Sequence, residues 1–352
     1  MTPHLNRVAT AVPPHDVHEA FVALARTLLP DERARTVFER MAERSGIAHR
    51  FAVLQAGRLD AGEVDTAGFY RRGAFPSTAA RMRLYEEAAP ALACEAVAGL
   101  HLDPAEVTHL VVASCTGFSA PGLDLQIARR LGLRPDVERT LVGFMGCAAA
   151  VPALRAARHI VRSEPEARVL VVCCELSSLH LQESAALEEV LSFLLFADGA
   201  AAALVTAEPH GLALEDFRNA VVPDTEGFIT WHIGDAGFRM HLSGRVPGRI
   251  AAVLRDDPDT LLRGTPASDY GLWAVHAGGR TILDAVEQGL ALPPDALRHS
   301  RAVLHDFGNM SSATVLFVLD RILREAPPPG TRGLALAFGP GMVAESFQFR
   351  AA

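Results

Sequence analysis

Cys147 has the sequence surroundings that best suit a nucleophile. It stands in Thr-Leu-Val-Gly-Phe-Met-Gly-Cys-Ala-Ala-Ala-Val, where a short apolar run over 140–144 is broken by glycine and an alanine-rich stretch begins. Apolar residues then recur at helical spacing as far as Val161, which predicts a strand, a turn and a helix with Cys147 near the helix N-terminus. Free N–H groups and the helix dipole favour a thiolate there, whereas a free cysteine, with a pKa of about 8.5, is only a few per cent ionised at neutral pH.

His276 and Asn309 are the polar residues most suited to act with this cysteine. Each follows what we interpret as a strand-like run, with glycines next to it and helix-forming residues after it, in Trp-Ala-Val-His-Ala-Gly-Gly and Asp-Phe-Gly-Asn-Met-Ser-Ser. Side chains at three strand ends can converge on one site. His276 can then hold the thiolate as an ion pair, and Asn309 can donate N–H to an oxyanion without adding negative charge.

Over nearly its whole length the chain resembles the type III polyketide synthases, the chalcone synthase-like branch of the thiolase superfamily. Besides the three residues above, the resemblance depends on the order and spacing of Cys115-Thr-Gly-Phe-Ser-Ala-Pro-Gly122, Leu195-Phe-Ala-Asp-Gly199, Gly308-Asn-Met-Ser-Ser-Ala and Phe338-Gly-Pro-Gly341. One departure is the alanine after His276, where many relatives carry proline. That change leaves the chemistry intact and loosens the turn.

The resemblance implies a reaction and a set of cavity residues. Cys147 takes an acyl group from an acyl-CoA starter, malonyl-CoA loses CO₂ to give an enolate held by His276 and Asn309, and the enolate attacks the thioester in a Claisen condensation. Phe196 matches a gate between the CoA tunnel and the reaction chamber, and Met240 replaces the partner phenylalanine of that gate. Further positions that match the chamber lining are Cys115, Thr116, Ser177, His180, Trp231 and Ser311. Ordinary core packing is the alternative at each of them.

Anionic coenzyme A must be held by guanidinium groups or backbone amides, because all 33 basic residues are arginine. Arg44 and Arg50 lie in the segment where relatives place basic CoA contacts, and the resemblance adds Gly278 and Gly279. Two solvated surface arginines are the alternative for Arg44 and Arg50. No metal or redox cofactor is implied, since decarboxylation drives the condensation and the cysteines lack metal-ligand spacing.

Composition bounds the class of protein. A chain of 352 residues with 49% hydrophobic residues can bury a large core, and a net charge of −8 argues against a nucleic-acid surface. No apolar run is long enough to span a membrane, and the N-terminus lacks a signal core. Five cysteines without paired spacing indicate a reducing compartment, so we expect a cytoplasmic protein.

A rough internal duplication predicts the fold. The run from His109 to Gly117 parallels 302–309, and 167–175 parallels 333–341, each interpreted as a buried strand leading to a turn. With the helices expected over 281–290 and 312–324, both halves alternate strands with helices. We predict an α/β, thiolase-like fold in which duplicated αβαβα halves, 1–208 with the cysteine and 209–352 with the histidine and asparagine, form a five-layered core.

Three points complete the sequence-based hypothesis. The family forms homodimers through the loop carrying Ala120 and Pro121, so we expect a homodimer. The cavity residues His180, Trp231 and Met240 favour a fatty acyl starter and an alkylpyrone, alkylresorcinol or related product, while starter length, number of extensions and ring type stay open. The polar segment 58–76 is expected to be a loop without an assigned role.

Other functions fit parts of the same evidence. A ketoacyl-ACP synthase III shares the Cys-His-Asn set and performs a single condensation on a carrier protein. A cysteine hydrolase would pass the acyl group to water, and a scaffold protein would use none of these residues. The motifs around Asn309 and Phe338 favour the polyketide branch over the first, the family motifs argue against the second, and the complete Cys-His-Asn set argues against a scaffold.

Overall fold

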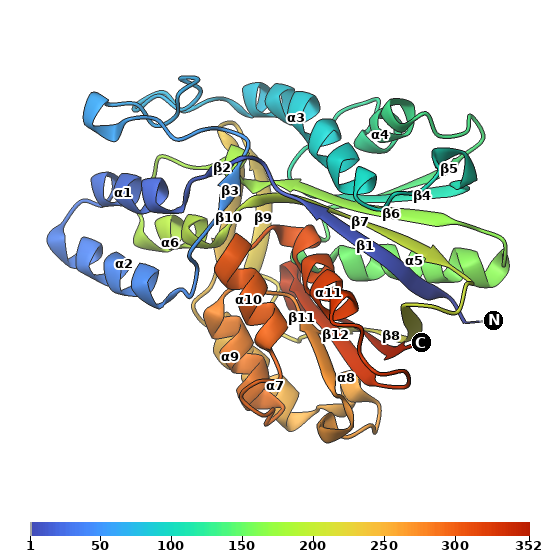
Figure 1. The fold of residues 1–352 in the computed structure, drawn as a ribbon. Helices are drawn as coiled ribbons and strands as arrows, with labels where there is room; N and C mark the ends of the chain where they lie inside the picture. Colours follow the sequence, from blue (N-terminus) through green and yellow to red (C-terminus); the bar gives the residue numbers. More distant parts are fainter. Residues whose placement is uncertain (1) are drawn as a thin grey trace.

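A computed structural model describes residues 2–352 as a mixed α/β fold around one nine-stranded sheet (Figure 1). Across the sheet the strands are β11 (Leu272–Val275), β12 (Arg332–Gly339), β13 (Val343–Ala351), β8 (Leu212–Val221), β1 (His4–Ala11), β7 (Asp198–Thr206), β6 (Val169–Leu176), β4 (His109–Ser114) and β5 (Glu138–Gly143). Two small sheets pair β9 (Ile229–Gly234) with β10 (Gly237–Leu242), and β2 (His15–Asp16) with β3 (Phe51–Ala52). The predicted α/β class is confirmed.

The sheet repeats one strand pattern in two halves. In the first half β4 runs parallel to β6, and β7 and β1 follow antiparallel. In the second half β11 runs parallel to β12, and β13 and β8 follow antiparallel. The halves join where His4 and Leu5 of β1 pair with the start of β8, and the first half has one further strand, β5. The predicted division at 208/209 falls between β7 and β8 and stays a prediction.

Helices cover both faces of these strands. They are α1 (His18–Leu28), α2 (Glu32–Arg44), α3 (Thr78–Ala98), α4 (Leu123–Leu131), α5 (Ala150–Ser163), α6 (Leu187–Leu195), α7 (Val246–Asp256), α8 (Asp259–Leu262), α9 (Arg280–Gly289), α10 (Arg298–Phe307) and α11 (Thr314–Arg324). Helix α5 contacts strands β4, β6, β7 and β13, while α11 contacts β1, β7, β11 and β12. These two helices therefore form a shared central layer between the halves, as the predicted layering requires.

Alternation along the strands explains why β4 is buried on both faces. Val111 and Ala113 pack into the core around α5, whereas Leu110 and Val112 pack into the core under α3. Successive side chains of a strand point to opposite faces, so an unbroken apolar run is what a strand between two helical layers needs. The helix expected after Cys147 is also explained by the spacing of its apolar residues, since Val151 and Leu154 of α5 are fully buried.

One element of the predicted duplication is wrong. Residues 302–307, expected to be a strand before Asn309, belong to helix α10. The true counterpart of β4 is β11, which ends directly before His276. The run 302–307 is apolar only at intervals and therefore fits a helix face as well as a short strand, and periodicity cannot separate the two over so few residues. Asn309 thus follows a helix.

Within residues 2–352, no helix has both the length and the apolar character needed to cross a bilayer, as expected.

Candidate active site

Cys147, His276 and Asn309 line one cavity, as predicted from their types. The cavity holds about 740 Å³ of empty space, part of it open to solvent. The other predicted residues that line it are Cys115, Thr116, Ser177, Phe196, Trp231, Met240, Gly278 and Ser311. Lining residues that sequence reasoning did not single out are mostly apolar and include Ile229, Leu242, Ile250 and Ile282. Nothing in their local sequence separates them from ordinary core.

Cys147 occupies the turn between β5 and α5. It is the middle residue of a 3-10 turn, η3 (Gly146–Ala148), directly before α5 begins at Ala150. Gly146 has φ +57°, and a Cβ there would lie 2.5 Å from Pro340 Cδ. Only glycine therefore permits this close approach of the second half to the turn. The cysteine side chain is partly exposed, and its surface opens into the cavity.

Asn309 is fixed by its neighbours. Its Oδ1 accepts a hydrogen bond from Ser311 N at 2.9 Å, and its Nδ2 donates to Gly278 O at 3.3 Å. These two bonds set the orientation of the amide, and Cys147 Sγ lies 3.9 Å from Nδ2. The second N–H of Nδ2 lies within weak hydrogen-bond reach of this sulfur, so the amide faces the place where an oxygen next to the sulfur would bind. Gly308, with φ +67°, makes the turn that brings Asn309 here.

His276 is buried directly after β11 and is not yet engaged. Its backbone N–H donates to Leu336 O at 2.8 Å, which anchors it to the sheet. Both ring nitrogens are buried without a hydrogen-bond partner. Burial alone lowers the pKa of His276 to about 3, so the imidazole is neutral at rest. A neutral ring can accept a proton at one nitrogen and donate one at the other.

The expected Cys147–His276 ion pair is not formed in this structure. Burial raises the pKa of the Cys147 thiol to about 11, although hydrogen bonds with Ser311 and Asn309 work in the opposite direction. Both groups are thus held in their neutral forms by desolvation, and a thiolate requires transfer of the thiol proton to His276. The charges that transfer creates would stabilise each other across the cavity.

Glu175 is a buried group of the site that sequence reasoning missed. It lies at the end of β6, and its carboxylate accepts hydrogen bonds from Cys115 N at 2.9 Å, Thr116 Oγ1 at 2.8 Å and Ser312 Oγ at 2.5 Å. Burial raises its pKa to about 7 despite these bonds. The glutamate therefore connects the segment that follows β4 in the first half to the turn before α11 in the second half. The feature of the sequence that could have identified Glu175 is a lone acidic residue at the end of an apolar strand.

Trp231 closes the cavity on one side, and His180 supports it from behind. Trp231 Nε1 donates to Cys115 O at 2.9 Å. His180 does not line the cavity, so that part of the prediction is wrong. Its Nδ1 accepts from Phe238 N at 3.0 Å, its Nε2 lies 2.7 Å from Thr116 O, and its ring is stacked on Phe238. These contacts fix a neutral tautomer, and burial lowers its pKa to about 3.

A second hollow adjoins the cavity and opens outward between α2, α6 and α9. The predicted CoA contacts Arg44, Gly278 and Gly279 all line it. Arg280, which the sequence did not suggest, lines it too and donates to Arg44 O at 3.2 Å. Gly279 directly precedes α9, so the free N–H groups of that helix face the hollow.

Arg50 does not belong to this entrance, and its assignment as a CoA contact is wrong. Its side chain is 3% exposed and donates to Phe193 O and Phe196 O at 2.8 and 2.6 Å. The ring of Phe21 lies 4.7 Å from its guanidinium carbon. Arg50 therefore stabilises the end of α6 from the protein interior, because its guanidinium donates hydrogen bonds to backbone carbonyls there.

Fold and site together fit one class, an enzyme of the thiolase type, with a cysteine, a histidine and an asparagine that line the same cavity. Sequence models of the chalcone and stilbene synthases match the N-terminal domain over residues 6–209 and the C-terminal domain over 214–352. The chain belongs to the chalcone and stilbene synthase family.

Individual relatives agree with this assignment. A Mycobacterium tuberculosis protein named "Alpha-pyrone synthesis polyketide synthase-like Pks18" is 36% identical over 284 residues, which cover 76% of this chain and 72% of the relative. The crystal structure of PKS-I from the brown alga Ectocarpus siliculosus is 32% identical, with a TM-score of 0.89 over 100% of this chain and 98% of that one. The C-terminal type III polyketide synthase domain of Steely1 from Dictyostelium is 25% identical, with a TM-score of 0.90 over 100% and 99%.

Proposed function

We propose that this protein is a type III polyketide synthase that loads an acyl-CoA starter on Cys147, extends it with malonyl-CoA and cyclises the product. The observation that carries the proposal is the single cavity in which Cys147 Sγ lies 3.9 Å from Asn309 Nδ2, with His276 in the same lining. Family membership supports the reaction class.

Loading moves one proton and one acyl group. Cys147 Sγ attacks the thioester carbonyl of the starter while its proton passes to His276, the neutral base of the cavity. The carbonyl carbon becomes tetrahedral and its oxygen becomes an oxyanion. The tetrahedral intermediate collapses, the CoA sulfur leaves, and the proton returns from His276 to that sulfur.

Extension uses Asn309 and His276 as hydrogen-bond donors. Malonyl-CoA loses CO₂, and the electron pair of the broken C–C bond forms an enolate whose oxygen accepts hydrogen bonds from Asn309 and His276. The enolate carbon attacks the acyl group on Cys147, and the sulfur leaves to regenerate the nucleophile. The extended chain, now on CoA, can return to Cys147 for another round. This series of reaction steps requires neither a metal nor a redox cofactor.

Coenzyme A would occupy the hollow lined by Arg44, Gly278, Gly279 and Arg280. Guanidinium groups and the N-terminal amides of α9 are suited to phosphate oxygens. Phe196 and Met240 line the inner cavity on the way to Cys147, which supports their predicted role as a gate. A methionine adapts its shape to a passing substrate more readily than an aromatic ring does.

A homodimer is part of this proposal. β5 is an edge strand with exposed residues along it, and Phe118, Leu141 and Met145 beside it are 41%, 45% and 36% exposed. Exposed apolar groups along a sheet edge are typical of a surface that another chain covers. The loop with Ala120 and Pro121 lies in the same region. A monomer by sedimentation at micromolar concentration, with full activity, would contradict this part. We also propose that the protein does not bind nucleic acid and that it is located in the cytoplasm.

We place the starter among fatty acyl groups and the product among alkylpyrones, alkylresorcinols or related polyketides. The cavity walls are largely apolar, and the mycobacterial relative carries alpha-pyrone synthesis in its name. The decisive experiment incubates the pure protein with malonyl-CoA and acyl-CoA starters of increasing length and identifies products by mass. Products extended by two or more malonyl units from CoA substrates alone support the proposal.

Two other outcomes would replace it. One condensation that occurs only with an acyl carrier protein would indicate a ketoacyl-ACP synthase III. Release of free fatty acid without malonyl-CoA decarboxylation would indicate a thioester hydrolase.

A further inference from the structure

We propose that His109, Glu138 and Glu164 bind a Zn²⁺ ion at the end of the sheet remote from Cys147. The donor atoms of these three side chains, one imidazole nitrogen and two carboxylate oxygens, all lie within 4.8 Å of one another. Imidazole and carboxylate together suit zinc, which takes four ligands and can complete the set with water. The site is independent of the reaction proposed above.

Strand register and alternation bring the three side chains to one face of the sheet. His109 begins β4 and is paired with Glu138, the first residue of β5. Alternate residues of a strand share a face, and Val111 and Ala113 of β4 pack into the core around α5, so His109 lies on the α5 face too. Glu164 directly follows the last residue of α5. Figure 1 shows β4, β5 and α5 on the side of the molecule opposite α1 and α2.

The imidazole of His109 is held in the orientation that a metal ligand needs. The residue is 6% exposed, and its Nδ1 lies 2.8 Å from Thr108 Oγ1. That hydroxyl also accepts from Arg168 N at 2.9 Å and donates to Arg168 O at 3.3 Å. A hydroxyl has one proton and two lone pairs, so all three contacts are satisfied when Nδ1 carries the imidazole proton. Nε2 then presents its lone pair to the two glutamates, and metal-binding histidines typically donate their other ring N–H in this way.

The spacing of the donor atoms suits a bridging cation better than direct hydrogen bonds. His109 Nε2 lies 3.7 Å from Glu138 Oε2 and 3.8 Å from Glu164 Oε2, which is beyond hydrogen-bond range. Two ligand atoms on one tetrahedral zinc, each about 2.1 Å from the metal, are roughly 3.4 Å apart. The glutamate side chains are 74% and 60% exposed, so small rotations can bring them onto an ion while the buried imidazole stays in place.

The two carboxylates also lack a counter-charge from the protein. Within residues 2–352 neither forms an ion pair with an arginine, and the neighbouring Arg168 is paired with Glu106 and Glu208. Glu164 lies at the C-terminal end of α5, where the helix dipole disfavours a negative charge. A divalent cation would offset both negative charges.

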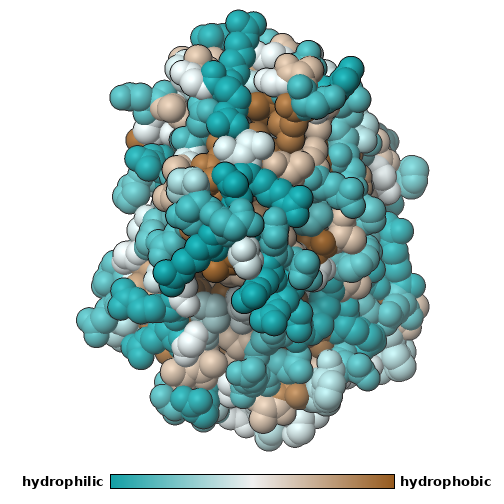
Figure 2. Space-filling view, turned by 90° about the vertical axis from the view of Figure 1, so that its left-hand side faces the viewer, coloured by the Kyte–Doolittle hydropathy of each residue, from teal (hydrophilic) through white to brown (hydrophobic). Residues whose placement is uncertain are grey.

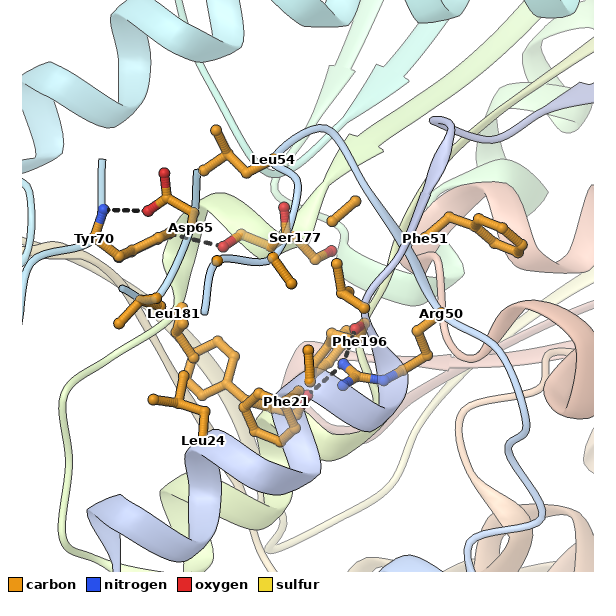
Figure 3. A pocket seen from close by; sticks show the side chains of 18 of the residues that line it. Phe21, Leu24, Arg50, Phe51, Leu54, Asp65, Tyr70, Ser177, Leu181 and Phe196 are labelled. Atoms are coloured by element: carbon orange, nitrogen blue, oxygen red, sulfur yellow. Dashed lines mark hydrogen bonds between the residues drawn. The ribbon is translucent and has the colours of Figure 1, made fainter. Parts of the chain in front are cut away.

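Charged groups on the opposite side of the molecule, toward α1, are bonded differently. Figure 2 shows that side, with hydrophobic atoms at the base of a hollow framed by hydrophilic residues. In the cavity drawn in Figure 3, Asp65 accepts backbone N–H groups and Arg50 donates to backbone carbonyls. The backbone satisfies these two charges, whereas the carboxylates of Glu138 and Glu164 point to a ligand from outside the chain.

The ion would join the two ends of the segment that carries Cys147. Glu138 begins β5, Glu164 follows α5, and Cys147 lies in the turn between these elements. An ion bound to both glutamates and to His109 would hold this strand, turn and helix against β4. The six residues of β4 separate the ion from the catalytic cavity by about 20 Å, so it takes no part in bond making. Since the site forms only in the folded chain, zinc should stabilise the fold.

The test measures Zn²⁺ affinity by competition with a chromophoric chelator. The background is full-length Cys147→Ala, which removes the thiol of the catalytic cavity as a rival ligand. Glu138→Gln, Glu164→Gln and His109→Asn each delete one donor atom, and the asparagine retains a polar group near the position of Nδ1. Glu166→Gln, at an exposed glutamate close to Glu164 in the chain, is the matched control. We expect each of the three substitutions to weaken binding by about tenfold or more, and the control to leave it unchanged.

Thermal unfolding gives a second readout that does not involve activity. At a free Zn²⁺ concentration of about a hundred times Kd, the Tm of the background and of the Glu166→Gln control should rise by about 4 °C. The three ligand variants should gain about half of that or less at the same concentration. Because Glu138 and Glu164 are exposed, their glutamine variants decide the matter even if His109→Asn does not fold. Absence of zinc binding, binding that survives all three substitutions, or equal stabilisation by Mg²⁺ would overturn the zinc site.

Discussion

The two halves of the molecule place corresponding turns side by side and use them differently. In the first half η3 leads into α5, and in the second half η6 (Ser311–Ala313) leads into α11. The two turns are in contact, and their middle residues are Cys147 and Ser312. Cys147 opens into the cavity, while Ser312 is fully buried and donates to Glu175. One turn thus presents the proposed nucleophile to the cavity, and its counterpart is hydrogen-bonded to the buried Glu175.

The difference shows that the duplicated scaffold supplies positions and that the residues at them decide the chemistry. The second half contributes both polar partners of the thiol, His276 after β11 and Asn309 before η6. Neither has a counterpart of the same type in the first half, where Cys115 directly follows β4. Four predictions test this division of roles.

The largest expected effect is at the two middle residues. Cys147→Ala should abolish both the acyl adduct and all product, because no other cavity group is placed to attack the starter. Ser312→Ala, the matched change in the other turn, should keep the adduct. Intact mass after brief exposure to an acyl-CoA measures both. An adduct on Cys115 or Cys173 in Cys147→Ala would refute the role of Cys147.

Asn309→Ala should lower the rate of malonyl-CoA decarboxylation by about 10²-fold or more, the usual effect of removing one oxyanion donor. Acylation of Cys147 should fall much less, since the thiol and His276 are intact. Asn309→Asp keeps the size of the side chain but opposes the enolate with negative charge, so it should be at least as slow. Equal loss of loading and decarboxylation in Asn309→Ala would show that the residue is structural.

His276 should control the reactivity of the thiol toward iodoacetamide. With a pKa of about 11, only about one thiol in 10⁴ is ionised at pH 7. In His276→Ala, where no base is left to take the thiol proton, alkylation of Cys147 should rise about tenfold per pH unit above neutrality, because the thiolate fraction does. Wild-type protein, in which proton transfer to His276 can accompany attack by the sulfur, should react faster at pH 7 and depend less steeply on pH. His305→Ala, at an exposed histidine, is the control, and identical pH profiles for all three proteins would contradict this role.

The smallest effect concerns stability through Glu175. Its folded-state pKa is raised from 4.5 to about 7, so between these values the folded protein binds more protons than the unfolded chain and stability falls as pH rises. The full penalty at higher pH is about 3 kcal/mol. Glu175→Gln, which cannot ionise, should flatten that part of the unfolding free energy against pH in denaturant titrations. A slope equal to that of wild type would assign the pH dependence to other groups.

The sequence predicted the parts of the fold that long apolar periods define. Helices α5, α9 and α11 and strands β5, β6 and β12 lie where the patterns placed them. It failed at 302–307, where a short apolar run fits either a strand or a helix, and the duplication was therefore aligned on the wrong element. The order of the strands in the sheet could not be predicted from the sequence pattern, because pairing across the sheet joins residues far apart in the chain.

The site residues that stand in recognisable motifs could be predicted from the sequence. Those whose role depends on how deeply the side chain is buried could not. Cys147, His276 and Asn309 stand in glycine-rich turns that a sequence displays. Arg50 and Arg44 look alike in sequence, yet one is sealed under α6 and the other faces the entrance. His180 and Glu175 show the same limit, since side-chain depth depends on elements that pack from elsewhere in the chain. The contacts of 58–76 also required the structure, because they reach α1 and the 178–183 region.

The hairpin β9–β10 is paired only with itself and stands apart from the nine-stranded sheet. It carries Trp231 and Met240 as a cross-strand pair, while Cys147, His276 and Asn309 belong to the central scaffold. Two residues proposed to shape the substrate cavity and the three proposed to make bonds thus lie on separate pieces of the chain. Substitutions in the hairpin can therefore change one wall of the cavity while Cys147, His276 and Asn309 stay in place.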